Sequence, residues 1–114
     1  MRIETTILGN LLQNEEYTRK VLPFLKTDYF TNNDEKIVYD TVSGFVTKYN
    51  SLPTKEALSI ELQEVKINEE EFKETMELLD EISNKTEEYT DLGWLLDTTE
   101  KFCQDKAIYN AVVE

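Results

Sequence analysis

The side chains of this 114-residue chain that could do chemistry are mainly carboxylates, because it has 24 Asp and Glu residues and no histidine. Histidine is the commonest general base and a very common metal ligand. A helical bundle can hold two metal ions with glutamates and Glu-x-x-His motifs, and that pattern cannot form without histidine. The three glycines are isolated, so the sequence has no glycine-rich phosphate loop. We therefore expect no catalytic residue, no cofactor-binding residue and no metal ligand in this chain.

The acidic runs and the single cysteine also have simple structural interpretations. Glu69 to Glu71 are typical of the first turn of a helix, where the helix dipole favours negative charge. Glu87 and Glu88 are expected in a solvated loop. Cys103 follows Phe102 on an apolar stripe and has no histidine partner, so we expect a buried structural thiol and not a nucleophile. A hydrolase that uses carboxylates alone is the least favoured class.

The charge balance argues against binding to nucleic acid, and the short apolar runs argue against a membrane-spanning helix. Twelve Lys and Arg residues leave a formal net charge of −12, and the only adjacent cations are Arg19 and Lys20. Phosphate binding depends on clustered cations, so we expect no direct contact with DNA or RNA. No apolar run approaches the ~20 residues that cross a bilayer, and the N-terminus lacks a signal-peptide pattern. One cysteine cannot form an internal disulfide, which predicts a soluble protein of the cytoplasm.

The elements that position these side chains are predicted to be helices throughout. Apolar spacing and capping residues predict six of them, beginning near Ile3, after Asn14, Asn32, Thr54 and Asn68, and near Asp91. Pro23 should break the second helix, because proline lacks the required N–H donor. Residues 84–90 read as a polar connection. The predicted fold is all-α, a compact bundle of about six helices with a long C-terminal helix.

The helical faces also predict which large side chains are buried. Tyr39, Phe45, Tyr49 and Leu79 fall on inner stripes and are expected in the core. Trp94 fits either the core or a partner contact, because amphipathic aromatics are common in both places. Tyr109 leaves the same two alternatives open.

The last predicted helix has apolar residues at alternating spacings of three and four. They are Leu92, Leu95, Thr99, Phe102, Lys106, Tyr109 and Val113. That spacing is typical of a helix packed along another helix, provided that the stem of Lys106 packs and its ammonium reaches water. No later residue covers Val112 and Val113, so we expect half of a hairpin that pairs with a following helix or another copy. The predicted interface comprises Trp94, Leu95, Thr99, Phe102, Lys106, Tyr109, Val112 and Val113.

Several motifs, taken in their order, resemble one known family. Glu4-Thr-Thr-Ile-Leu-Gly-Asn-Leu-Leu12 is similar to the first helix of the N-terminal domain of DnaB-type replicative helicases. Asp28-Tyr-Phe30 stands where that family has an Asp-x-Phe motif after its second helix. Ile37-Val-Tyr39 resembles the family's third helix, and Leu52-Pro-Thr54 resembles the turn into the fourth. The stretch from Trp94 through Phe102 to Asn110, with Pro23, resembles most the helicases of large T-even-like phages. The resemblance covers essentially the whole chain.

The resemblance implies a fold, a role and a set of partners. Residues 1–90 would be the helical head of the domain, and residues 91–114 the first helix of its oligomerisation hairpin. The parent would be a hexameric, ATP- and Mg-dependent DNA helicase in the cytoplasm of an infected bacterium. This chain would be its N-terminal collar, which forms a trimer of dimers and docks primase or a helicase loader. The family's hairpin needs a second long helix, which this sequence lacks.

The main alternative is a different class of protein. A stand-alone acidic phage protein could mimic DNA with its carboxylates and so inhibit a host enzyme.

Overall fold

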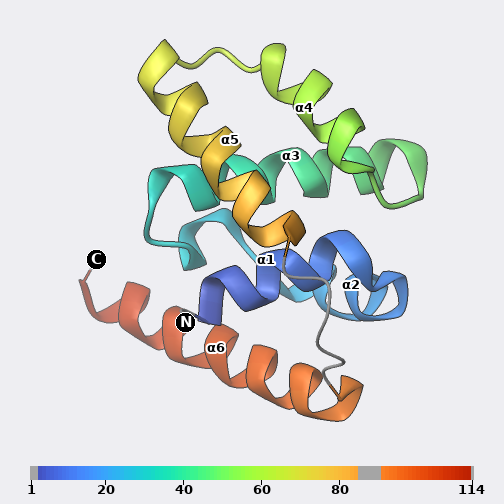
Figure 1. The fold of residues 1–114 in the computed structure, drawn as a ribbon. Coiled ribbons are helices and arrows are strands. Elements are labelled where there is room, and N and C mark those ends of the chain that lie inside the picture. Colours follow the sequence, from blue (N-terminus) through green and yellow to red (C-terminus); the bar gives the residue numbers. More distant parts are fainter. Residues whose placement is uncertain (1–2, 85–90, 114) are drawn as a thin grey trace.

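The chain folds into helices alone within the residues that a computed structural model describes, 3–84 and 91–113 (Figure 1). The elements in order are α1 (Ile3–Gln13), α2 (Glu15–Val21), the 3-10 turns η1 (Leu22–Phe24) and η2 (Thr27–Tyr29), α3 (Asn33–Tyr49), α4 (Lys55–Gln63), α5 (Glu69–Asn84) and α6 (Leu92–Val113). The predicted all-α bundle of about six helices with a long last helix is confirmed. Residues 85–90 of the expected polar connection lie outside the described residues, and Glu87 and Glu88 are among them.

The predicted helix starts are also confirmed, because the capping side chains bond as their spacing requires. Asn14 Oδ1 accepts a hydrogen bond from the Tyr17 amide at 3.1 Å. Asn68 Oδ1 accepts from the Glu71 amide at 2.7 Å, and Glu71 Oε1 accepts from the Asn68 amide at 3.2 Å. These bonds satisfy amides that have no partner within a helix's first turn. Glu69 begins α5, as its acidic run predicted.

Pro23 ends the second helix as expected. α2 stops at Val21, and the next three residues tighten into η1 with Pro23 in its first turn. The chain then becomes extended at Leu25. This change of direction buries Leu25 and leaves the Phe24 side chain 69% exposed.

One hydrophobic core joins all six helices. Its largest fully buried apolar side chains include Tyr17, Phe30, Ile7, Leu8, Leu11, Leu58, Leu62, Leu79, Ile82 and Leu95. The ring of Phe30 stacks on Tyr39 at 5.2 Å and lies 5.8 Å from Phe102, so the turn after η2 connects α3 to α6. The burial predicted for Tyr39 and Leu79 is confirmed.

The burial predicted for the end of α3 is wrong. Tyr49 is 50% exposed, and Phe45 is half-buried and lies outside the core cluster. The two rings pair with each other at 4.7 Å. The cause is the groove that remains beside these rings, whose other side is formed by Glu61 of α4 and by Val65 just after that helix.

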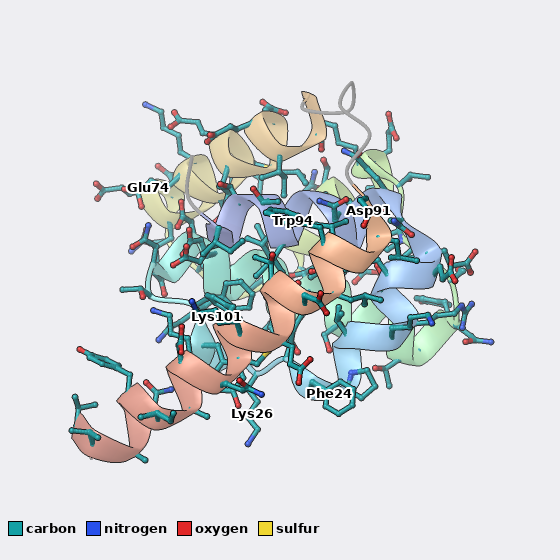
Figure 2. The ribbon with its side chains drawn as sticks, turned by 90° about the horizontal axis from the view of Figure 1, so that it is seen from below. Phe24, Lys26, Glu74, Asp91, Trp94 and Lys101 are labelled. Carbon is teal, nitrogen blue, oxygen red and sulfur yellow. The ribbon has the colours of Figure 1, made fainter. Side chains whose placement is uncertain are left out.

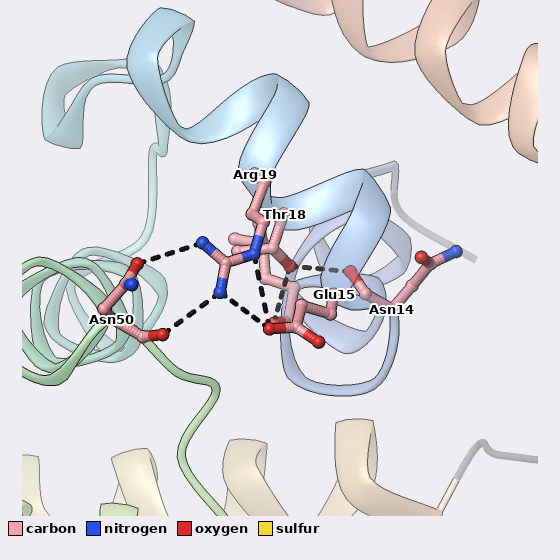
Figure 3. A network of polar contacts seen from close by, with 6 residues as sticks. Asn14, Glu15, Thr18, Arg19 and Asn50 are labelled. Atoms are coloured by element: carbon pink, nitrogen blue, oxygen red, sulfur yellow. Dashed lines mark hydrogen bonds and ion pairs between the residues drawn. The ribbon is translucent and has the colours of Figure 1, made fainter.

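A polar network fixes α2 against the end of α3 (Figure 3). Arg19 donates from Nη1 to the side-chain oxygen of Asn50 at 3.0 Å and from Nη2 to its carbonyl at 3.1 Å. The same guanidinium pairs with Glu15 at 2.7 Å. Asn50 has the left-handed conformation, φ 54°, that ends α3. The Arg19–Glu15 ion pair is exposed and lies within α2, so it adds little stability. The two hydrogen bonds from Arg19 to Asn50 join α2 to the residue that ends α3.

These burial differences predict unequal costs of truncation. Leu79→Ala should lower the free energy of unfolding by ~2–5 kcal/mol, because it leaves a cavity in the core. Phe45→Ala should cost less, roughly 1–2 kcal/mol, because that ring is only partly buried and lies outside the core cluster. Urea denaturation of the two variants checks this. A loss for Phe45→Ala that equals the loss for Leu79→Ala would contradict the assigned core.

Candidate protein-interaction site on the last helix

The first turns of α6 pack against α2 and the turn η2. Leu95, Thr99 and Phe102 are 1%, 2% and 6% exposed. The hydroxyl groups of Tyr17 and Thr99 lie 2.6 Å apart in a buried hydrogen bond that joins α2 to α6. Burial raises the pKa of Tyr17 to about 12, although the bond to Thr99 acts in the opposite direction.

This seating corrects part of the predicted interface. Leu95, Thr99 and Phe102 were expected to meet a partner helix, and they contact this chain's own head instead. The reason is that α2 and η2 together form the surface that receives them. The spacing of three and four does mark one face of α6, but from Leu95 to Phe102 that face lies on the core of the same chain.

Two polar contacts join the later turns of α6 to the segment at and just after η2. Lys106 Nζ lies 3.4 Å from Thr31 Oγ1, and the ammonium is within 6.0 Å of the rings of Phe102 and Tyr109. Asn110 Nδ2 donates to the carbonyl of Asp28 at 3.3 Å. The half-buried Lys106 thus has its ammonium at the surface, as its place on the stripe required.

The end of α6 presents a cluster of exposed apolar side chains. Ile108, Tyr109, Val112 and Val113 are 65%, 62%, 79% and 61% exposed. They form two adjacent rows with a spacing of four residues, so all of them share one broad face. The predicted interface omits Ile108, because this residue lies beside the predicted apolar stripe and not on it. Its distance of four residues from Val112 was the available signal.

Trp94 lies at the other end of the same helix. Its indole is 51% exposed, and its backbone amide donates to Asp91 Oδ2 at 2.9 Å, which caps α6. Of the two places that the sequence left open, the structure therefore gives Trp94 the surface and not the core. Tyr109, left open in the same way, is exposed too. Figure 2 shows Trp94 and Phe24 on either side of α6.

The flank of α6 next to Phe24 is hollowed into an apolar groove of about 570 Å³. Its walls include Val21 and Phe24 on one side and Leu96, Cys103 and Ala107 on α6. Sequence reasoning missed this groove because it exists only where the break at Pro23 turns η1 against α6. Cys103 is half-buried, and burial raises the pKa of its thiol, which disfavours the reactive thiolate.

The described residues hold no group of three or more His, Cys, Asp or Glu side chains that could bind a metal ion. No helix within them is long and apolar enough to span a bilayer.

The chain is similar to a DnaB-like replicative helicase of Enterobacteria phage T4. The two sequences are 29% identical over 105 residues, which is 92% of this chain and 22% of the phage T4 protein. This similarity confirms the resemblance seen in the sequence motifs, and the chain matches a piece of a larger relative. No family model matches the chain.

The burial of the Tyr17 hydroxyl, which raises its pKa, predicts an alkaline limit to stability. The pKa of Tyr17 is about 12 in the folded protein and 10.0 normally, so the unfolded chain loses this proton first. Stability from this group is complete below pH 10 and is lost as pH rises towards 12, by about 1.4 kcal/mol per pH unit. Tyr17→Phe should make the decline shallower between these pH values, as measured by denaturation at a series of pH values. An unchanged slope would contradict the assignment.

Proposed function

We propose that this chain is the N-terminal collar domain of a phage replicative hexameric DNA helicase. In this role it joins subunits and receives primase or a helicase loader. The motor domain of the parent would use ATP and Mg²⁺, in the cytoplasm of an infected bacterium. The similarity to a piece of the phage T4 helicase, which extends over 92% of this chain, supports this proposal.

The observation that carries the joining role is the exposed apolar end of α6. Single exposed apolar residues are common on protein surfaces, but a contiguous group often marks a protein contact. Ile108, Tyr109, Val112 and Val113 form such a group on a regular helix. Complete burial of each side chain is worth roughly 1.5–3 kcal/mol. A second helix laid along this face would bury all four, whether it comes from the same subunit or from a neighbour.

The charge of the chain fits a collar that surrounds a DNA-handling motor. A net charge of −12 repels phosphates, so the domain does not compete with the motor for the strand. The groove beside Phe24 offers a second apolar surface for another protein. The alternative of a DNA mimic uses the same charge but gives no role to these apolar surfaces, so we favour the collar.

The first expected outcome concerns nucleic acid and nucleotide. The chain should neither hydrolyse ATP nor bind single-stranded DNA, since clustered cations and a phosphate loop are both missing from its sequence. Fluorescence anisotropy with a labelled oligonucleotide at ~0.15 M salt checks the binding, and phosphate release checks the hydrolysis. Micromolar or tighter binding of DNA would count against the collar.

The second expected outcome concerns assembly. Tyr109→Asp should weaken self-association of a longer form of the protein that extends beyond α6, because it places a charge in the apolar face. Ala111→Asp is the matched control, since Ala111 is exposed in the same turn on the opposite side. Light scattering measures assembly, and circular dichroism checks that both variants remain helical. A longer form that stays monomeric at high concentration, or equal effects of both substitutions, would refute the joining role.

A further inference from the structure

The groove beside Phe24 runs along α6 for about three turns. On the α6 side its lining begins at Leu96 and ends at Ala107. A helix rises about 1.5 Å per residue, so this side of the groove is about 16 Å long. Val21 at the end of α2 and Phe24 in η1 form the opposite side. The groove is therefore long enough to hold a short helical segment beside α6.

The apolar side chains on both sides of this groove are incompletely covered by the chain itself. The Phe24 ring is 69% exposed and takes no part in the core. Leu96 and Cys103 on the α6 side are half-buried. Contact between water and apolar surface is unfavourable, so a second apolar surface laid into the groove would be held there. The break at Pro23 thus places the Phe24 ring outside the core, where a partner can cover it.

The walls of the groove restrict the backbone conformation of a bound segment. They come from α2, α6 and the turns η1 and η2, and the backbone groups of a helix are bonded within the helix itself. An extended segment in this groove would find few main-chain partners and would leave its own N–H and C=O groups unpaired. A helix satisfies these groups internally, and helices bind in apolar grooves through side chains spaced three and four residues apart. The walls therefore favour a helix over an extended segment.

Opposite charges stand on the two sides of the groove. Lys20 lies on the α2 side and Glu100 on the α6 side, and both residues are exposed. In the part of the chain that the structure describes, neither of them forms an ion pair. Glu100 accepts a hydrogen bond from the side-chain amide of Gln104 at 3.3 Å. A bound helix would therefore meet a cation along one edge and a carboxylate along the other.

We infer that the groove beside Phe24 binds an amphipathic helix of a partner protein. This helix has an apolar stripe about three turns long, acidic residues along the edge that faces Lys20 and basic residues along the edge that faces Glu100. A second copy of this chain does not offer such a helix. Among the described residues, the exposed apolar end of α6 runs only from Ile108 to Val113, a length of about 1.7 turns. The inference rests on the proposed role in receiving another protein, and it does not depend on the joining role.

The probe for this site is a synthetic helical peptide of about four turns. Leucines lie along one face, glutamates along one edge of that face and lysines along the other edge. NMR titration of the ¹⁵N-labelled chain should show shifts at Leu96, Glu100, Cys103 and Ala107. A peptide with proline in its middle turn cannot complete the helix and should bind about tenfold more weakly. A peptide with glutamine along both edges should bind about threefold more weakly, in the range of one or two exposed ion pairs.

The two charges should also fix the direction of the bound helix. If the glutamates and lysines of the peptide are exchanged, the helix must reverse its direction to keep its acidic edge on Lys20. A nitroxide group on the N-terminus of each peptide reports this direction, because it broadens the NMR signals near it. It should broaden signals near Leu96 with one peptide and near Ala107 with the other. General attraction between a peptide and an acidic protein does not produce such a reversal.

Two pairs of variants separate this groove from the rest of the surface. Phe24→Ala should weaken binding about tenfold, which corresponds to 1.4 kcal/mol, with little change in melting temperature because the ring is mostly exposed. Trp94→Ala is its control, since Trp94 is an exposed aromatic on the other side of α6 and should not affect binding (Figure 2). Lys20→Gln should weaken binding about threefold. Lys73→Gln removes the same charge from the exposed surface of α5 and should have no effect.

The opposite results would overturn the inference. Equal affinity for the helical peptide and its proline form would give the groove to an extended segment. One direction for both charge patterns, or equal weakening by Phe24→Ala and Trp94→Ala, would exclude recognition by this groove. A dimer of the chain that Phe24→Ala dissociates would give the groove to a second copy.

This test and the assembly test fail separately. Peptide binding by a protein whose longer form stays monomeric would refute only the joining role. A longer form that assembles through Tyr109, together with no peptide binding at the groove, would refute only the helix-binding inference.

Discussion

The packing of α6 on α2 is the constraint on which the rest of the structure depends. Its centre is the hydrogen bond between Tyr17 and Thr99, two hydroxyl groups that are far apart in sequence and fully enclosed. A buried hydroxyl without a partner is costly, so any rotation or shift of α6 that separates the pair is disfavoured. The bond thereby selects one orientation of a helix whose apolar stripe alone would allow several.

Other features follow from that orientation. With α2 held against α6, the break at Pro23 directs η1 along the flank of α6, and the groove beside Phe24 results. The same placement carries the last turns of α6 past η2, which leaves Ile108 and Val112 in solvent. On the other side of α2, Arg19 holds the end of α3 through Asn50. The position of α2 therefore determines where both apolar surfaces lie and how the chain leaves α3.

The sequence was sufficient where structure is decided locally. Asn14 and the Asn68–Glu71 pair act within a single turn, and Pro23 breaks a helix in almost any setting, so these features could be predicted. The sequence was insufficient where a distant neighbour decides. Phe45 lies on a correct inner stripe, but only α4 determines whether that stripe is covered. Leu95 and Phe102 have the spacing of a coiled-coil seam, and the same spacing also suits a helix lying on a globular head. For the same reason neither groove could be foreseen, since each exists only between two packed elements.

The way in which α6 is fastened gives it the properties of a lever. Thr99 is held in the core, whereas the polar contacts of the outer turns, Lys106 to Thr31 and Asn110 to Asp28, are 3.4 and 3.3 Å long and close to solvent. Exposed contacts of this kind contribute little free energy. A sideways load on the apolar end would break them first and tilt the helix about Thr99 while the core stayed closed. The angle of the free end can thus adapt to a neighbour at small cost, and the head remains rigid.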